Sequence, residues 1–286
     1  MAARRSYPYT VLDVFTDRAL AGNQLGVVRD ADDLDDERME EFARETRLSE
    51  TTFVQAASER EADYRNRIFT VAGEIPFAGH PSLGTAVAIA IARGQGEASY
   101  IQQTGAGLQP VDVRLENDHA WASMLQAPAE FGPEVDPHDV VAAVGLVLGD
   151  AHRELPPQVV STGLPTLIAP VLKVTCVSAA KPDLELVEDL TRKYDTPNLY
   201  LVCLQEDGTA RARMFSRLVA GGEDPATGSA AGPLCAYLAE RGRGHRVEIT
   251  QGVEMRRPSR LVAEMHNGRP RVGGSVVKVI EGEVLL

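Results

Sequence analysis

Two segments of the 286-residue chain consist almost entirely of small and apolar residues, and both are longer than an ordinary strand. They occupy residues 79–94 and 228–242, each begins and ends with Gly, and their starts lie about half the chain apart. A helix that is apolar on every face is a buried helix, and about 15 residues are too few to span a membrane. We therefore expect two buried helices, each in the middle of a sheet layer.

The sequence pattern that precedes each of these two segments is also repeated. A short strand is expected before each, at residues 67–70 and 213–216, and a polar, turn-rich connection separates strand from helix. Such self-similarity is typical of two homologous halves, although two alanine-rich helices could also coincide. The sequence therefore predicts an α/β (α+β) fold of two pseudo-symmetric domains, each with a sheet wrapped around one central helix.

Local patterns predict the remaining elements. Segments rich in β-branched or alternating apolar residues predict strands at residues 9–15, 24–28, 51–54, 64–70, 158–161, 166–172, 199–204 and 246–251. The acidic segment 30–41 predicts a loop that leads into a helix, residues 139–148 a short helix, and residues 275–286 a strand, a turn and a final strand.

Three prolines between residues 126 and 137 are typical of an interdomain linker. We therefore place a first domain at residues 1–126, completed by the final strand at about 280–286, and a second domain at residues 127–279. Two domains also agree with the length of the chain, at roughly 150 residues per domain.

Composition limits the classes of function. The net charge is −12, which argues against a nucleic-acid partner, because binding phosphates requires clusters of Lys and Arg. The three Cys are widely spaced in apolar segments, so we expect buried free thiols and a cytoplasmic location rather than a disulfide framework. No signal peptide or membrane span is expected, and the six His lack the spacing of metal ligands.

The segments that lead into the two apolar helices, residues 74–80 and 221–229, have the character of a binding site. The N-terminus of a helix has free N–H groups and a partial positive charge, so it binds anions such as carboxylates. Two such termini at one interdomain cleft would converge on a single small anion. The alternative is that Gly79 and Gly228 only serve tight turns and that Ser229 is an ordinary N-cap.

Four sequence blocks, together with Asp13-Val-Phe15 and Gly22-Asn23, resemble the signature blocks of the phenazine biosynthesis PhzF-like family. They are residues 48–54 (LSETTFV), 75–81 (IPFAGHP), 223–234 (EDPATGSAAGPL) and 251–259 (QGVEMRRPS). The resemblance implies the fold of diaminopimelate epimerase, in which two similar domains each wrap a curved mixed sheet around a central helix and the active site lies between them. It also implies a homodimer that needs no cofactor.

The resemblance also implies roles for single residues. Glu50 is similar to the family's catalytic acid/base, and His80 and Asp224 are similar to residues that flank the substrate. Further contacts to the substrate would come from Ser49, Gly79, Gly228 and Ser229. In the phenazine enzyme the glutamate takes a proton from C3 of trans-2,3-dihydro-3-hydroxyanthranilate and returns one to C1, which a single carboxyl can do when burial brings its pKa towards neutrality. We therefore predict a cofactor-independent isomerase of a small anionic carboxylate.

Other chemistries fit the sequence less well. Two-base epimerases and proline racemases of this fold use one cysteine before each central helix, where this chain has Ala78 and Pro225. A serine hydrolase would need a Gly-x-Ser-x-Gly elbow, and a nucleotide-binding protein would need a Gly-x-Gly-x-x-Gly turn. The sequence has neither motif between an expected strand and an expected helix. The alternative function is a non-catalytic small-molecule binder or scaffold on the same fold.

Overall fold

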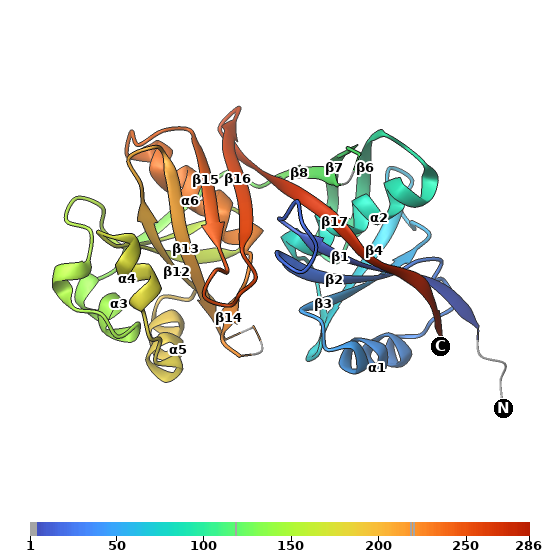
Figure 1. The fold of residues 1–286 in the computed structure, drawn as a ribbon, viewed down its shortest axis with the longest axis horizontal. Helices are drawn as coiled ribbons and strands as arrows, with labels where there is room; N and C mark the ends of the chain where they lie inside the picture. Colours follow the sequence, from blue (N-terminus) through green and yellow to red (C-terminus); the bar gives the residue numbers. More distant parts are fainter. Residues whose placement is uncertain (1–4, 118, 218, 220) are drawn as a thin grey trace. The chain divides into compact units, whose positions relative to one another are not determined.

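The structure is a computed structural model that describes residues 5–117, 119–217, 219 and 221–286. Its strands and helices divide into two units (Figure 1). Unit 1 comprises Met1–Met124 and Gly273–Leu286, and unit 2 comprises Leu125–Val272. The chain thus leaves unit 1 two residues before the expected boundary, and it returns at residue 273 rather than at about 280.

Unit 1 is a closed ring of strands. They pair in the order β1–β2–β3–β4–β6–β7–β8–β17, and β17 pairs with β1 again. Their bounds are Ser6–Val14 (β1), Asn23–Val28 (β2), Glu50–Gln55 (β3), Tyr64–Thr70 (β4), Glu97–Thr104 (β6), Gly107–Leu115 (β7), Ala120–Leu125 (β8) and Arg269–Leu285 (β17). The pairs β2–β3 and β4–β6 are parallel, so the sheet is mixed, as predicted.

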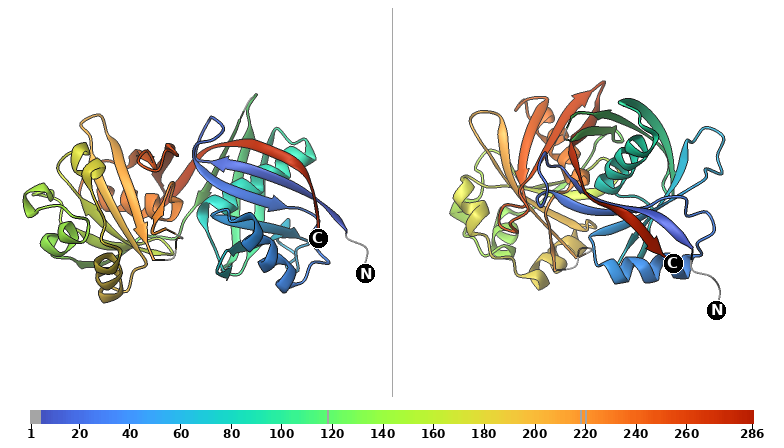
Figure 2. Two further views of the ribbon diagram at one scale, coloured as in Figure 1. Left: turned by 60° about the horizontal axis from the view of Figure 1, so that its bottom comes forward. Right: turned by 45° about the vertical axis from the view of Figure 1, so that its right-hand side comes forward.

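Helix α2 (Gly79–Arg93) lies inside this ring (Figure 2). Every residue of α2 up to Ala90 is buried, as the lack of a polar face predicts. Gly84 lets the helix approach the sheet, because a Cβ there would lie 2.5 Å from the side chain of Leu25. The helix ends at Gly94 in the left-handed conformation, which agrees with the predicted end.

Helix α1 (Asp36–Thr46) covers the other face of the same sheet. It buries Met39 and Ala43 in a cluster with Phe53 and Phe69. The acidic segment is therefore part loop and part first turn, as predicted. Its carboxylates at the start of the helix are favoured by the positive end of the helix dipole.

Unit 2 repeats this design. Its strands pair in the order β9–β10–β11–β12–β13–β15–β16, with β11–β12 and β13–β15 parallel. Their bounds are Glu130–Glu134 (β9), Gln158–Ser161 (β10), Pro165–Pro170 (β11), Asn198–Leu204 (β12), Thr209–Ser216 (β13), Arg246–Gln251 (β15) and Ser259–His266 (β16). Helix α6 (Gly228–Glu240) is buried from Ala230 to Leu238 and packs on β10, β11, β15 and β16.

The two units therefore share the same central arrangement of strands and buried helix, and the predicted pseudo-symmetric fold is confirmed. In each, an antiparallel strand follows the first parallel pair and carries a short extra strand, β5 (Gly73–Ile75) on β4 and β14 (Glu223–Asp224) on β13. The buried helix comes directly after this short strand. The start of each central helix is thus fixed by a sheet edge only a few residues away.

Further helices pack on the other face of the unit 2 sheet. They are α3 (Pro137–Ala143), the short 3-10 helix Leu148–Asp150, α4 (Val174–Ala179) and α5 (Leu184–Lys193). Val140, Val177 and Val187 from these helices share one core cluster with Leu201 and Phe215 of the sheet. Among the described residues no helix is long and apolar enough to cross a membrane.

Three local predictions are wrong. Residues 126–137 are more than a linker, because they contain β9, which pairs with β10. Residues 275–286 contain no turn, because β17 pairs with β1 along all of β1 and accommodates one extra residue at a bulge. The helix expected at residues 139–148 ends at Ala143, shortly before Gly145 takes a φ of 69°.

Candidate active site

The carboxyl of Glu50 and the imidazole of His80 meet in unit 1. Glu50 is the first residue of β3, paired with Leu25 of the parallel strand β2, and His80 lies in the first turn of α2. His80 Nε2 is 3.1 Å from Glu50 Oε2, and the two side chains are only 7% and 17% exposed. The start of a strand and the start of the buried helix thus bring together an acid and a base that the sequence predicts as site residues.

This contact is close but not well aligned. Within the described part of the chain, Glu50 Oε2 receives no hydrogen bond of good geometry, although His80 Nε2 is near enough to donate one. Catalytic hydrogen bonds are often poorly aligned without substrate and tighten when it binds. A small change in side-chain orientation would therefore bring the pair into hydrogen-bonding geometry.

Asn23, the first residue of β2, approaches the other ring nitrogen of His80. Its Nδ2 lies 3.3 Å from His80 Nδ1. An amide NH₂ group can only donate, so Nδ1 accepts, and the neutral imidazole carries its proton on Nε2. His80 therefore presents an N–H group to the carboxylate form of Glu50.

Ser49 and Gly79 flank this pair in the chain. Ser49 is exposed at the bend before β3, and Gly79 is the first residue of α2. The N-cap residue, Ala78, makes no side-chain hydrogen bond to the first turn. The partial positive charge at this helix N-terminus is therefore not offset by a capping side chain, which suits the binding of an anion.

Asp224 anchors a second group of residues, in unit 2. It is buried at 8% exposure, and its Oδ2 accepts a hydrogen bond of 2.5 Å from the hydroxyl of Thr227. Gln251, the last residue of β15, donates through Nε2 to the backbone oxygen of Asp224 (2.8 Å) and to Thr227 Oγ1 (3.0 Å). Both the backbone and the side chain of Asp224 are thus held by neighbours.

Gly228 and Ser229 begin α6. The N-cap is Thr227, so the alternative of Ser229 as an N-cap is wrong. The carbonyl oxygen of Gly228 accepts a hydrogen bond of 2.9 Å from Gln126 Nε2, and Ser229 is half-buried. Ser229 therefore lies in the first turn of α6, at the position that His80 occupies in α2.

Gly252 ties the turn before α6 to the end of β15. It has a φ of 75°, and a Cβ there would lie 2.5 Å from the backbone oxygen of Pro225. Only a residue without a side chain fits this backbone conformation and this close approach. Gln251 is consequently held directly beside the turn that carries Asp224.

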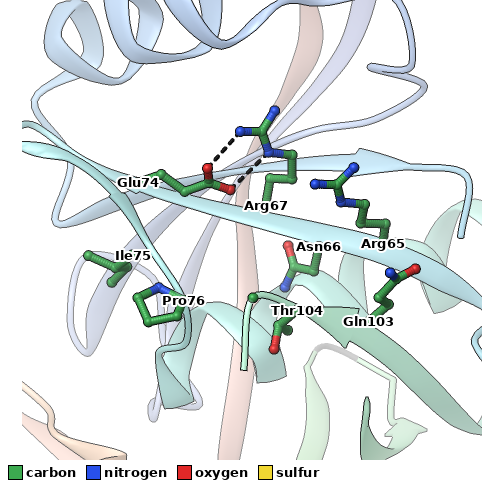
Figure 3. A pocket seen from close by; sticks show the side chains of 9 residues that line it. Arg65, Asn66, Arg67, Glu74, Ile75, Pro76, Gln103 and Thr104 are labelled. Carbon is green, nitrogen blue, oxygen red and sulfur yellow. Dashed lines mark hydrogen bonds and ion pairs between the residues drawn. The ribbon is translucent and has the colours of Figure 1, made fainter. Parts of the chain in front are cut away.

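In both units an Arg–Glu ion pair links the short strand before the central helix to the neighbouring strand of the sheet. In unit 1, Arg67 of β4 donates two hydrogen bonds, of 2.8 and 2.6 Å, to Glu74 of β5 (Figure 3). In unit 2, Arg213 of β13 donates two of 2.8 Å to Glu223 of β14. Hydrogen bonding to these carboxylates raises the pKa of both guanidinium groups above the ordinary value. Both arginines therefore stay charged, and the two ion pairs fix the short strand that precedes each helix start.

The sequence signal for this pair is Arg-x-Phe followed by Glu-x-Pro-x-x-Gly, which we did not predict to be functional. It occurs at residues 67–79 and again at 213–228. In both units the Phe faces the Glu in the strand register, and the Arg lies over the Phe ring, with its central carbon 5.2 and 4.9 Å from the ring centre. A search for charged residues at the same distance before the two helix glycines could have identified Glu74 and Glu223.

The shared register also shows where the units differ. The acid and base of unit 1 have neutral counterparts in unit 2, and the acid of unit 2 has an apolar counterpart in unit 1. The pairs of counterparts are Glu50 with Asn198, His80 with Ser229, and Ile75 with Asp224. Each chemically active side chain therefore occurs once, on a scaffold that occurs twice.

A pocket of about 340 Å³ adjoins the Arg67–Glu74 pair (Figure 3). It reaches Pro76 of the turn that leads to α2, but neither Glu50 nor His80 lines it. Among the side chains of the described ranges, no three His, Cys, Asp or Glu residues gather as metal ligands would. The candidate chemistry is therefore that of Glu50 with His80 in unit 1 and of Asp224 in unit 2.

Comparison with known proteins relates nearly the whole chain to one family. The family model of phenazine biosynthesis-like proteins matches residues 12–282. Over 269 residues the chain is 37% identical to the trans-2,3-dihydro-3-hydroxyanthranilate isomerase of Pseudomonas aeruginosa, with 92% of each chain covered. The match confirms the resemblance that the four sequence blocks indicate.

Solved structures support the same relationship. A protein from Pseudomonas aeruginosa described as a predicted epimerase is similar with a TM-score of 0.86 and 36% identity, over 98% of this chain and 99% of that one. A phenazine biosynthesis protein of the PhzF family from Bacillus anthracis is similar with a TM-score of 0.85 and 30% identity, over 99% and 100%. The expected fold class is therefore confirmed along the full chain.

Proposed function

Since the chain belongs to the family of phenazine biosynthesis-like proteins, we propose that it isomerises a small carboxylate by moving one proton with the carboxyl of Glu50, without a cofactor. Curated relatives at 33–37% identity are named isomerases, and the chain is an isomerase of this family. The observation that supports a single carboxyl as the base is the 3.1 Å contact between Glu50 Oε2 and His80 Nε2 at the start of α2.

In the proposed reaction the Glu50 carboxylate first takes a proton from a carbon of the substrate. The electron pair left behind moves into the adjacent double-bond system. Glu50, now a carboxylic acid, then returns a proton at the far end of the shifted double bond, which restores the enzyme and leaves the composition of the substrate unchanged. In a substrate such as trans-2,3-dihydro-3-hydroxyanthranilate, after which three relatives are named, these carbons would be C3 and C1.

His80 has a role in both steps. Its Nε2–H group lies 3.1 Å from Glu50 Oε2, and we propose that it donates to the carboxylate when substrate binding aligns the pair. When Glu50 becomes protonated, the same N–H group is released and can donate to the negative charge that develops on the substrate. His80 thus keeps Glu50 ready as a base without being consumed.

The remaining predicted residues are assigned to substrate binding. We place the substrate's own carboxylate at the N-terminus of α2, near Gly79 and Ser49, because a helix N-terminus attracts anions. The family resemblance supports Asp224, Gly228 and Ser229 as further participants in the same reaction. It also supports a homodimer, and the three buried free thiols favour a reducing compartment such as the cytoplasm.

Exchange in heavy water tests the proposal. The protein is incubated in heavy water with trans-2,3-dihydro-3-hydroxyanthranilate and with related cyclic and amino carboxylates, and deuterium uptake is followed by mass spectrometry. We expect at least one compound to gain deuterium, and Glu50→Gln to slow the uptake by about 100-fold or more, since general base catalysis contributes roughly 10²–10⁴-fold. Glu61→Gln, which changes an exposed glutamate in the same unit, should leave the rate unchanged.

The same compounds distinguish an enzyme from a binding protein. A ligand that binds the folded protein raises its melting temperature. If a carboxylate stabilises both the unaltered protein and Glu50→Gln while no compound gains deuterium, the isomerase proposal is contradicted and the non-catalytic binder is supported.

A further inference from the structure

A chain of hydrogen bonds in unit 2 ends on the Asp224 carboxyl. It begins at the buried hydroxyl of Tyr200, which donates to Gln251 Oε1 at 3.0 Å. The amide group of Gln251 continues to Thr227, and Thr227 to Asp224 Oδ2. Gln251 is fully buried and Thr227 is 6% exposed, so water does not compete freely for these groups.

One backbone N–H group determines which atom donates and which accepts in each hydrogen bond of this series. The N–H group of Thr227 can only donate, and it lies 3.3 Å from Gln251 Oε1. This places the NH₂ group of Gln251 towards Thr227 Oγ1, which must accept from it. The hydroxyl of Thr227 has one proton, and that proton is therefore directed to Asp224 Oδ2 at 2.5 Å.

The two ends of this series, Tyr200 and Asp224, agree with this assignment of donors and acceptors. Burial is the main cause that raises the pKa of Tyr200, with the charge of Asp224 a second cause. Tyr200 therefore keeps its proton at neutral pH and acts as the donor at the start of the chain. A carboxylate oxygen accepts at the other end, and hydrogen bonds to a charged acceptor are the stronger ones.

The fold itself does not need this chain of hydrogen bonds. In unit 1 the counterparts of Asp224, Thr227 and Gln251 in the strand register are Ile75, Ala78 and Thr104. None of the three can reproduce it, and the Thr104 hydroxyl instead donates to the backbone oxygen of Gly107. Unit 1 nevertheless forms the same sheet and the same buried helix. The sheet and the buried helix can therefore form without such a network, which in unit 2 ends on the Asp224 carboxyl.

We propose that Thr227 and Gln251 are positioning residues that hold the Asp224 carboxylate in one orientation for the isomerase reaction. This inference rests on the proposed participation of Asp224 in that reaction. Thr227 and Gln251 act through Asp224 and need not touch the substrate themselves. The role requires the hydroxyl of Thr227 and not its methyl group, so valine should impair the reaction at this position and serine should not.

The test compares Thr227→Val with Thr227→Ser. Valine keeps the shape and removes the donor, whereas serine keeps the donor. We expect kcat/KM to fall by about tenfold or more in Thr227→Val and to stay within about threefold in Thr227→Ser. The control is Thr191→Val, which removes a buried hydroxyl that donates to a backbone oxygen within α5, and it should lose stability without losing activity.

Crystal structures of the same variants give a readout that does not depend on activity. We expect the Asp224 carboxyl to rotate or lose order in Thr227→Val and to stay in place in Thr227→Ser and Thr191→Val. An ordered, unmoved carboxyl in Thr227→Val, or activity equal to that of Thr191→Val, would overturn the inference. Absence of activity in the unaltered protein on every carboxylate would instead contradict the proposed function, and the crystal structures would still decide the positioning role.

Discussion

Glu50 Oε2 lies 3.1 Å from His80 Nε2, and both side chains are largely buried. The two residues come from the start of a strand and the start of the helix that the ring of strands encloses. Because Asn23 donates to the opposite ring nitrogen, the imidazole faces Glu50 with a proton and not with a lone pair. An imidazole in this tautomer can donate to the Glu50 carboxyl, which is the arrangement that the proposed one-base reaction requires.

Replacing Asn23 tests this assignment of the imidazole proton. Asn23→Ala removes a neutral hydrogen bond worth about 0.5–1.5 kcal/mol, so we expect kcat/KM to fall by about 2- to 10-fold. Asn23→Asp should have a larger effect, because a carboxylate accepts from Nδ1–H and moves the proton away from Nε2. Nitrogen-15 NMR of the imidazole gives the direct measurement. A proton on Nδ1 in the unaltered protein would contradict the assignment.

The two Arg–Glu pairs should differ in their contribution to stability. Glu223 is 17% exposed and Glu74 is 41% exposed, so removing the arginine leaves a buried charge only in unit 2. We expect Arg213→Met to lower the free energy of unfolding by about 3–5 kcal/mol and Arg67→Met to lower it less. Urea denaturation measures both. Arg213→Met combined with Glu223→Gln should regain part of the loss, and equal losses in the two single variants would disagree with this explanation.

Gly252 should tolerate a side chain far less well than Gly242. Both have a positive φ, of 75° and 65°, but a Cβ at Gly242 meets no atom within 4 Å, whereas a Cβ at Gly252 lies 2.4 and 2.5 Å from two backbone oxygens. We expect Gly242→Ala to cost about 1–2 kcal/mol of stability and Gly252→Ala clearly more. Thermal unfolding compares the two variants, and similar melting temperatures would show that the close approach is not needed.

The three thiols should be unreactive in the folded protein. Burial raises the pKa of Cys176 and Cys203, and it raises the pKa of Cys235 to about 12. In the unfolded chain thiols ionise near pH 8.5, so the contribution of these thiols to stability should be constant below about that pH and fall above it. Thiol labelling at pH 8 measures the reactivity. Rapid labelling without denaturant would contradict the burial of these groups.

The parts of the fold that local composition determines could be predicted from the sequence. The segments at 79–94 and 228–242 are apolar on all sides, and this property alone requires burial wherever the sheet lies. The strand at Tyr64–Thr70 and the end of α2 at Gly94 follow from alternation and from a glycine in the left-handed conformation. Such signals do not depend on distant residues.

Features that depend on pairing between distant segments could not be predicted. β17 forms one long strand, despite a sequence that indicates a turn, because all of β1 pairs with it from Val276 to Leu285. Family resemblance alone indicates Glu50, His80 and Asp224 as the proposed site residues, and it did not predict which side chains contact them. Asn23, Thr227 and Gln251 lie next to them only because the register of several strands places them there.

The most direct test of the central claim follows one labelled proton. The proposed substrate trans-2,3-dihydro-3-hydroxyanthranilate, carrying deuterium at C3, is incubated with the protein in ordinary water under single-turnover conditions, and any product is examined at C1. If Glu50 alone moves the proton, part of the deuterium should reappear at C1, and Glu50→Gln should react about 100-fold more slowly or not at all. Turnover by Glu50→Gln within about tenfold of the unaltered protein would contradict the claim.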